Sequence, residues 1–143
     1  MQTISETTDP AKRILAFGGF LFMSFLGILV AYFDPQKVSF FPRCLFHELT
    51  GFACTGCGLT RGFHALFRGD FSAALHYNAL FPLYGILLGS LYLHLFLLTF
   101  RGKGIPLSPE KCFRLLTAFL IIGIIFGVLR NLPFYPFTLL YPF

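Results

Sequence analysis

Charged residues are scarce in this chain. Asp, Glu, Lys and Arg make up 12% of its 143 residues, which is about half of their share in an average soluble domain. Hydrophobic residues reach 56%, more than the core of a soluble domain of this length encloses. The shortage of charge therefore excludes an ordinary soluble protein and indicates a chain embedded in a lipid bilayer.

Several patterns that mark particular functions are missing as well. The sequence has no Ser/His/Asp order, no carboxylate pair, no phosphate-binding glycine loop and no dinucleotide fingerprint, so we expect no enzyme of these classes. The net charge is +5, but the basic residues never form a run, and we expect no nucleic-acid partner. Tryptophan is absent, and the six tyrosines are its natural replacements at the membrane interface.

Three apolar segments are long enough to cross a bilayer, at about residues 14–33, 79–100 and 112–130. A spanning helix needs about 20 mostly apolar residues, and each segment supplies that number. Ser108 followed by Pro109 is a typical helix start, because serine caps a helix and proline fits its first turn. The sequence predicts an all-α membrane protein with three transmembrane helices.

Polar or proline-broken segments flank the spans. Residues 1–13 form a polar tail, and 14–143 form a single helical membrane domain. The first connection is a cysteine-containing loop at 34–70, and the apolar, proline-rich tail at 131–143 is too short to span, so we expect it to lie extended or re-entrant at the interface. The first apolar run is longer than the core of a signal peptide and no small-x-small cleavage pattern follows it, so we expect a retained helix.

A short amphipathic helix is predicted within the cysteine-containing loop, from Thr60 onward. At 3.6 residues per turn, one face carries Cys57, Arg61, His64 and Arg68, and the other face is apolar. The segment is too short to span the bilayer. We therefore expect an interfacial helix whose basic face meets water or lipid phosphates.

Basic residues flank the spans unevenly. With the N-terminus inside, six of them would be cytoplasmic and five external. Arg61, Arg68 and Arg130 occupy positions that suit a structural role, and setting them aside leaves six against two. We therefore expect a cytoplasmic N-terminus and a cysteine-containing loop on the outer face.

Two pairs of glycines lie four residues apart in the second and third spans, Gly85 with Gly89 and Gly123 with Gly127. Small residues at this spacing let helix backbones approach closely. The pairs are candidate contacts between the two spans, with a second copy of the chain or with another membrane protein. His94, in the second span, lies six residues from its end, and we expect the side chain to reach the interface.

Three of the four cysteines and two of the four histidines lie in one part of the cysteine-containing loop. Two of these cysteines form a C-x-x-C motif, which is common in zinc-binding loops. This grouping predicts a metal site, with zinc as the candidate cofactor. Its four ligands would be Cys44, Cys54, Cys57 and either His47 or His64.

Two other interpretations of the cysteines stay open. In a redox site, the start of the following helix and Arg61 would lower the pKa of the Cys57 thiol and favour the thiolate, although the thioredoxin-type scaffold that usually carries a C-x-x-C is missing. In a structural element, Cys44 would form a disulfide with Cys54 or Cys57 and leave one thiol over.

Three strings in the sequence are distinctive: CTGCGLTRGF at 54–63, ALFRGDFSAALHYNAL at 65–80 and RNLPFYPF at 130–137. They resemble the DUF2752 family of small bacterial membrane proteins, whose function is unassigned, and the resemblance implies a multi-pass protein of the bacterial inner membrane. Members usually carry proline within the Cys-x-Gly-Cys element, where this chain has Thr55. By resemblance, the motif positions are Cys44, Cys54, Cys57, Gly58, Thr60, Arg61, Asn78, Arg130 and Asn131.

Two functions fit these expectations. In the first, which is not enzymatic, the segment 44–68 is a structural or metal-binding element that docks a partner or ligand at the membrane surface. In the second, the protein is a membrane thiol-disulfide redox or transfer enzyme that uses Cys54 and Cys57. The bilayer is a partner in both. Candidate contacts for an anion or a protein partner are Arg61, Arg68 and Arg130.

Overall fold

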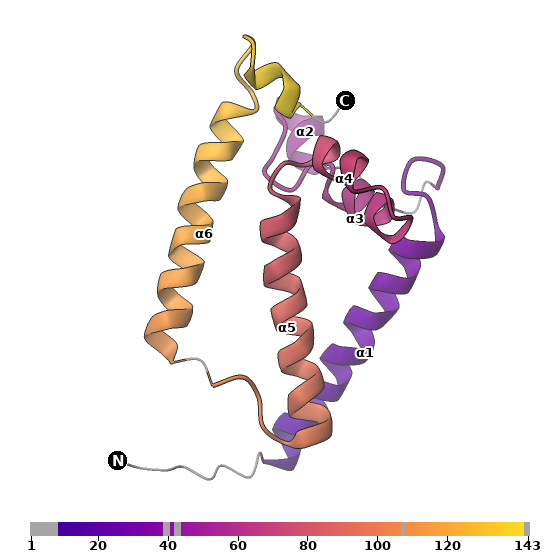
Figure 1. Cartoon of the computed structure of the whole chain (residues 1–143), viewed down its shortest axis with the longest axis vertical. Coiled ribbons are helices and arrows are strands. Elements are labelled where there is room, and N and C mark those ends of the chain that lie inside the picture. The colour runs from indigo at the N-terminus through magenta and orange to yellow at the C-terminus, as the bar shows by residue number, and fades with distance from the viewer. Residues whose placement is uncertain (1–8, 39–40, 42–43, 107, 142–143) are drawn as a thin grey trace.

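The computed structural model describes residues 9–38, 41, 44–106 and 108–141, and this part of the chain is helical, with no strands (Figure 1). Parts of the polar tail, of the cysteine-containing loop and of the C-terminal tail lie outside the described residues. The elements in order are α1 (Pro10–Tyr32), α2 (Leu45–Thr50), α3 (Leu59–Phe67), α4 (Phe71–Tyr77), α5 (Phe81–Arg101), α6 (Pro109–Leu129) and a 3-10 helix, η1 (Phe137–Leu140).

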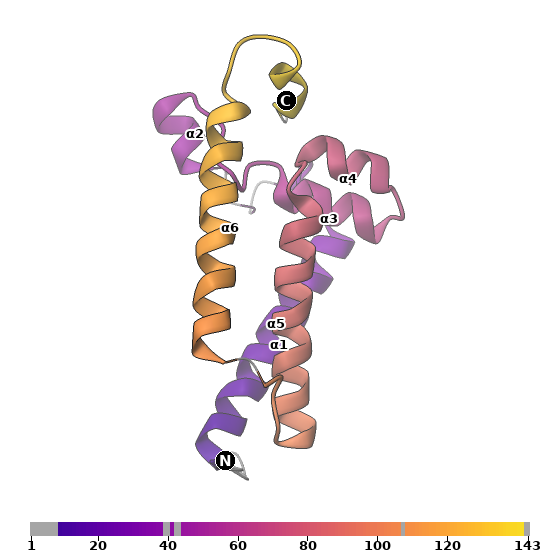
Figure 2. The ribbon, with the colours of Figure 1, turned by 60° about the vertical axis from the view of Figure 1, so that its left-hand side comes forward.

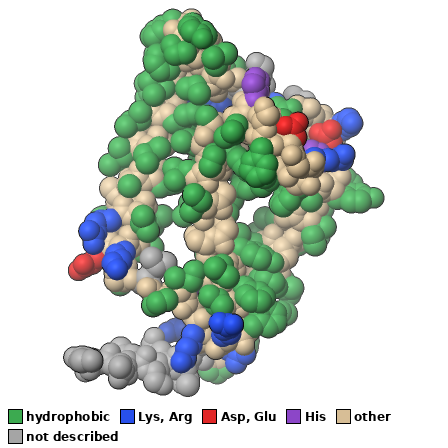
Figure 3. All heavy atoms as spheres, viewed as in Figure 1, with side chains coloured by type: hydrophobic (Ala, Val, Ile, Leu, Met, Phe, Trp, Pro, Cys, Tyr) green, Lys and Arg blue, Asp and Glu red, His purple; other side chains and the backbone are tan. Residues whose placement is uncertain are grey.

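The three long helices α1, α5 and α6 are the predicted spans. Their 23, 21 and 21 residues correspond to lengths of about 32 to 34 Å, enough to cross the hydrocarbon core of about 30 Å. Their mean hydropathies are 2.4, 1.8 and 2.5, and large apolar side chains cover their sides (Figure 3). The fold class predicted from the sequence is confirmed.

Helix bounds differ by a few residues from the expected spans, because each helix continues into a polar flank. α1 begins at Pro10, where proline fits the first turn of a helix, and not at Ile14. At the start of α6, Ser108 accepts a hydrogen bond from the backbone N–H of Lys111, as its sequence context predicts.

α1 and α5 pack against each other through aromatic side chains. The ring of Phe20 on α1 lies 5.0 Å from that of Tyr92 and 5.9 Å from that of Phe96, centroid to centroid. Ser24 and the hydroxyl of Tyr92 are hydrogen bonded at 3.1 Å. This bond satisfies two polar groups that would otherwise face lipid, and it fixes the register of the two helices.

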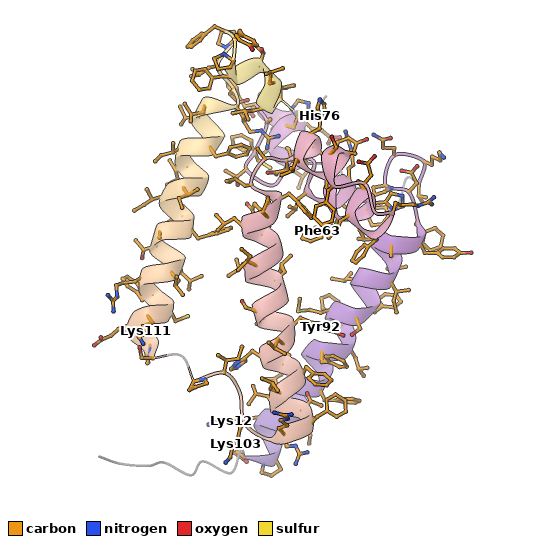
Figure 4. All side chains as sticks on the ribbon, viewed as in Figure 1. Lys12, Phe63, His76, Tyr92, Lys103 and Lys111 are labelled. Atoms are coloured by element: carbon orange, nitrogen blue, oxygen red, sulfur yellow. The ribbon has the colours of Figure 1, made fainter. Side chains whose placement is uncertain are left out.

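The short helices α3 and α4 form a tight pair at one end of the bundle. Gly69 turns the chain between them with a φ of 83°, and Asp70 caps α4 by accepting from Ala73 N–H. A Cβ on Gly62 would lie 3.2 Å from the carbonyl oxygen of Ala74, so the absence of a side chain permits the close contact. The pair packs on the start of α5 through Phe63 (Figure 4).

The two ends of the molecule differ in chemistry. The short helices α2, α3, α4 and η1 gather at one end, and the connection between α5 and α6 lies at the other (Figures 1 and 2). Lys12, Lys103 and Lys111 lie at this second end (Figure 4). The structure thus separates a largely cationic end from an end that carries the cysteine-containing loop.

His94 organises the connection between α5 and α6. Its Nδ1 atom accepts a hydrogen bond of 3.0 Å from the backbone N–H of Ile105. A Cβ added to Gly104 would overlap the imidazole ring, so glycine is what allows the loop to lie against the histidine. The side chain that we expected to reach the interface contacts the loop that connects the two spans.

Candidate functional site

Three cysteine side chains meet between α2 and α3. Cys44 is the N-cap of α2, and Cys54 and Cys57 lie in the loop that leads to α3. The Sγ atom of Cys54 is 3.2 Å from that of Cys44 and 3.3 Å from that of Cys57, and all three sulfurs lie within 4.8 Å of one another. All three are free thiols. We call Cys44, Cys54 and Cys57 the thiol cluster.

The loop reverses direction within the C-x-x-C motif. The N–H of Cys57 donates to the carbonyl of Cys54 at 3.1 Å, and the N–H of Leu59 donates to the carbonyl of Gly56 at 3.0 Å. Gly58 then adopts a left-handed conformation with a φ of 83° and begins α3. Of the two glycines that flank Cys57, Gly56 and Gly58, only Gly58 has a positive φ.

The guanidinium of Arg130 holds this loop from the end of α6. The residue is 1% exposed, and its Nη1 atom donates to the carbonyl oxygens of Cys54 at 2.7 Å and Cys57 at 3.3 Å. Nη2 donates to the Cys57 carbonyl at 3.3 Å, and the guanidinium carbon lies 4.9 Å from the centroid of the Phe126 ring. Arg130, a candidate contact for an anion in the sequence, thus binds backbone carbonyl groups of the thiol-bearing loop.

Two asparagines complete the attachment of the loop. Asn131 accepts from the N–H of Ala53 at 2.8 Å and donates to its carbonyl at 2.9 Å, as a paired strand would. Asn78, before α5, is 0% exposed and donates to the carbonyl groups of Thr55 at 2.8 Å and Cys57 at 3.2 Å. We call Asn78, Arg130 and Asn131 the polar clamp.

The glycine pair of α6 contacts the loop. Cβ atoms built on Gly123 and Gly127 would lie 3.9 and 3.1 Å from the Cγ2 atom of Thr55. Cβ atoms on Gly85 and Gly89 of α5 would meet nothing within 4 Å. The small residues of α6 therefore make room for Thr55, and the pair on α5 faces open space that lipid or another chain would fill.

A pocket of about 1060 Å³ opens beside the thiol cluster. Cys57 and Arg61, which the helical spacing placed on one face, both line it. Its remaining charged lining residues are Lys37 and Glu48. The thiol cluster thus lines a pocket with both polar and apolar walls at the end of the bundle.

Two thiols of the cluster have shifted pKa values. Burial, together with the neighbouring thiols, raises the pKa of Cys57 to about 12. Burial also acts to raise the pKa of Cys44, but backbone N–H groups at the start of α2 and hydrogen bonds with Cys54 and Cys57 outweigh it, so its pKa lies below the ordinary value. The expectation that the helix start and Arg61 lower the pKa of Cys57 is wrong, because Cys57 is only 5% exposed.

The other candidate residues are spread around the cluster. His64 lies with its Nδ1 atom 2.7 Å from the carbonyl oxygen of Val30 on α1. Thr60 is exposed at the pocket, and Arg68 is exposed at the end of α3. Asn78 was expected to be a structural motif residue by resemblance. It is fully buried, and its amide donates to two carbonyl groups of the loop, as a buried polar group requires.

Comparison with known proteins adds a family but no function. Residues 44–92 match a family model described as a protein of unknown function (DUF2752), and this segment contains the thiol cluster, α3, α4 and the first half of α5. No curated protein and no solved structure matches the chain.

We predict that Arg130→Lys loosens the loop. A lysine keeps the charge but loses the planar arrangement of N–H donors, which leaves buried carbonyl groups of Cys54 and Cys57 without full partners at a cost of about 2 kcal/mol. Opening of the loop should then be about 30-fold more frequent. Maleimide labelling of Cys57 in detergent, mapped by mass spectrometry, should accelerate accordingly.

Arg68→Lys on the exposed end of α3 is the matched control and should leave the labelling of Cys57 unchanged. Cys112, which is exposed at the other end of the molecule, serves as an internal reference because it should react equally in every variant. Equal labelling of Cys57 in Arg130→Lys and the wild type would contradict the role of Arg130.

We predict that Gly127 and Thr55 are energetically coupled. Gly127→Ala should be less favourable by about 1 kcal/mol in the wild type than in a Thr55→Ser background, because the serine lacks the Cγ2 methyl group that the new Cβ meets. Thermal unfolding in detergent measures the cycle. Gly89→Ala on α5 is the control and should have the same effect in both backgrounds.

Proposed function

The chain belongs to the DUF2752 family, and on that premise we propose that it is a non-enzymatic membrane protein that binds a metal ion at the membrane surface. The family model covers the thiol cluster but assigns it no role. The proposal therefore depends on the chemistry of the cluster itself. Zn²⁺ is the ion proposed, since it favours thiolate and imidazole ligands in a tetrahedral arrangement.

The approach of three sulfurs to within 4.8 Å of one another supports this proposal most directly. Zn–S bonds of about 2.3 Å place the sulfurs of a tetrahedral site about 3.8 Å apart. The separations of 3.2 and 3.3 Å are about half an ångström shorter than this value, so each of these two pairs of sulfurs would move apart by about that much to accommodate the ion. Binding would release the thiol protons, and the positive charge of the ion would offset the cost of a buried thiolate at Cys57.

The surroundings of the cluster also suit a metal site. The polar clamp holds the backbone of the loop before any ion arrives, which reduces the ordering that binding requires. The pocket provides an entry path, and its charged side chains, Lys37, Glu48 and Arg61, are those that a partner delivering or receiving the ion would meet. This is the docking element at the membrane surface that we propose.

Thiol-disulfide exchange is the second candidate function. Cys54 lies within 3.3 Å of both other sulfurs, so it is placed to form a disulfide with either. A disulfide between Cys44 and Cys54 would pass two electrons and two protons to an external disulfide. Cys57 suits this chemistry less well, because it is only 5% exposed. Cys44 and Cys54 are more exposed than Cys57.

We predict that the protein, purified in mild detergent under reducing conditions, carries about one Zn²⁺ per chain. Cys44→Ser, Cys54→Ser and Cys57→Ser should each lose the ion. Cys112→Ser is the matched control, since this cysteine lies on α6 at the opposite end, and it should retain the ion. Elemental analysis gives the metal content, and circular dichroism shows whether the variants remain helical.

Other results would decide between the two functions. A metal-free protein whose Cys44 and Cys54 become linked on mild oxidation and are trapped as a disulfide in cells supports thiol-disulfide exchange. A metal-free protein with three reduced, unreactive thiols contradicts both functions.

We also propose that the N-terminus is cytoplasmic, in a bacterial inner membrane. Six basic residues flank the spans at the end away from the thiol cluster: Lys12, Arg13, Arg101, Lys103, Lys111 and Arg114. At the other end, Arg130 is buried and engaged in the polar clamp, which supports leaving it out of the charge comparison. The excess of basic residues therefore favours the α5–α6 connection inside and the thiol cluster outside.

We predict that Cys112 is protected from a membrane-impermeant maleimide in intact cells and reacts after permeabilisation, because this orientation places the start of α6 in the cytoplasm. Labelling is read as a mass shift of the peptide that contains Cys112. Cys112→Ser confirms the assignment by removing the shift. Labelling of Cys112 in intact cells would reverse the proposed orientation.

A further inference from the structure

The thiol cluster supplies three ligands, and a closed tetrahedral zinc site needs a fourth. We propose that His47 is this fourth ligand, an inference that rests on the metal-binding function proposed above. His47 lines the same pocket as Cys44, Cys54 and Cys57. Under this proposal the site is a closed S₃N site, and the protein stores or senses the ion without presenting an open coordination position to a substrate.

The direction in which α2 faces supports this assignment. Of the six residues of α2, five are exposed, and His47 alone is partly buried. α2 therefore turns one side chain toward the body of the protein, and that side chain is an imidazole that lines the same pocket as the three thiols. Glu48, the neighbouring residue that also lines the pocket, is exposed. Carboxylate oxygen is in addition a less favourable ligand than imidazole for a thiolate-rich zinc site.

The spacing of the residues gives a second argument. Cys44 and His47 are separated by two residues, as are Cys54 and Cys57. Cys44 is the N-cap of α2 and His47 its third helical residue, two positions that lie one turn apart at the start of a helix. Each pair thus spans one turn of backbone, and two such turns facing each other are the usual construction of a small zinc site.

The C-terminal tail lies against this histidine. The rings of His47 and Tyr141 are 6.4 Å apart, centroid to centroid, and the hydroxyl of Tyr141 donates to the carbonyl of Gly51 at 3.4 Å. Gly51 is the residue that ends α2. The tail therefore contacts both the middle and the end of α2, which restricts where the imidazole can lie.

The alternative ligands are placed less well. His64 does not line the pocket, and its Nδ1 atom lies 2.7 Å from the carbonyl oxygen of Val30. Cys112, the fourth cysteine, is near the start of α6 at the opposite end of the molecule. Among the described histidines and cysteines, His47 is thus the one that shares the pocket with the thiol cluster.

The test uses Co²⁺ in place of Zn²⁺, because its visible spectrum reports the number and type of ligands. Full-length protein in detergent is titrated with Co²⁺ and then with Zn²⁺ as a competitor. His47→Ala should weaken binding by more than about 100-fold, since loss of even an outer contact of a metal ligand costs about 10- to 100-fold. Its spectrum should lose the intensity typical of tetrahedral Co²⁺.

His47→Cys should restore tight binding and shift the Co²⁺ bands to those of an all-thiolate site, an effect that a merely structural histidine would not produce. His64→Ala is the matched control and should change neither affinity nor spectrum. Wild-type protein that binds Co²⁺, with His47→Ala unchanged from it in both respects, overturns the assignment of His47 but leaves the metal site. Wild-type protein that binds neither Co²⁺ nor Zn²⁺ overturns the metal site and the assignment together.

Discussion

The structure depends on one buried arginine. Arg130 follows the largely apolar last turns of α6, and its guanidinium donates to the carbonyl oxygens of Cys54 and Cys57 in the C-x-x-C loop. A cation that is 1% exposed is costly unless its donors are satisfied, so the loop must sit where it does for α6 to end there. The same contacts satisfy carbonyl groups of Cys54 and Cys57 that no helix or strand would satisfy. The arginine and the irregular loop therefore stabilise each other.

This mutual dependence explains the arrangement of the three spans. α1 and α5 pack directly through aromatic rings and a hydrogen bond, whereas α6 is joined to the rest through the loop, with Thr55 seated at Gly127 and one aromatic contact between Tyr84 and Phe119. The loop thus acts as the packing partner of α6 near its end. A change in the loop should consequently alter how α6 stands beside the other two helices, which links the chemistry of the cysteines to the membrane-embedded part.

Local features of the sequence predicted the fold and failed at long range. The three spans follow from apolar length, and the capping residue Ser108 follows from its context. The sequence predicted that the thiols of Cys44, Cys54 and Cys57 lie together, because these residues are only ten and three positions apart. It could not pair Arg130 with Cys54, which is 76 residues away, since no pattern specifies which buried carbonyl a distant cation meets. Nor could the sequence predict that the pKa of Cys57 is raised, because the burial that raises it depends on which distant residues pack against the thiol.

The two halves of the thiol cluster are held to different degrees, and this difference bears on how an ion would act. The half that contains Cys54 and Cys57 is fixed by the polar clamp. The other half is Cys44, which is the N-cap of α2, a helix that carries the proposed ligand His47 and has no buried residue and five exposed ones. An ion bound by both halves would tie the exposed helix to the fixed loop, and the free energy of binding would appear as order in α2. Leu45, Phe46 and Leu49 on α2 are exposed, so an ion bound by both halves would also hold these apolar side chains in place at the end of the bundle.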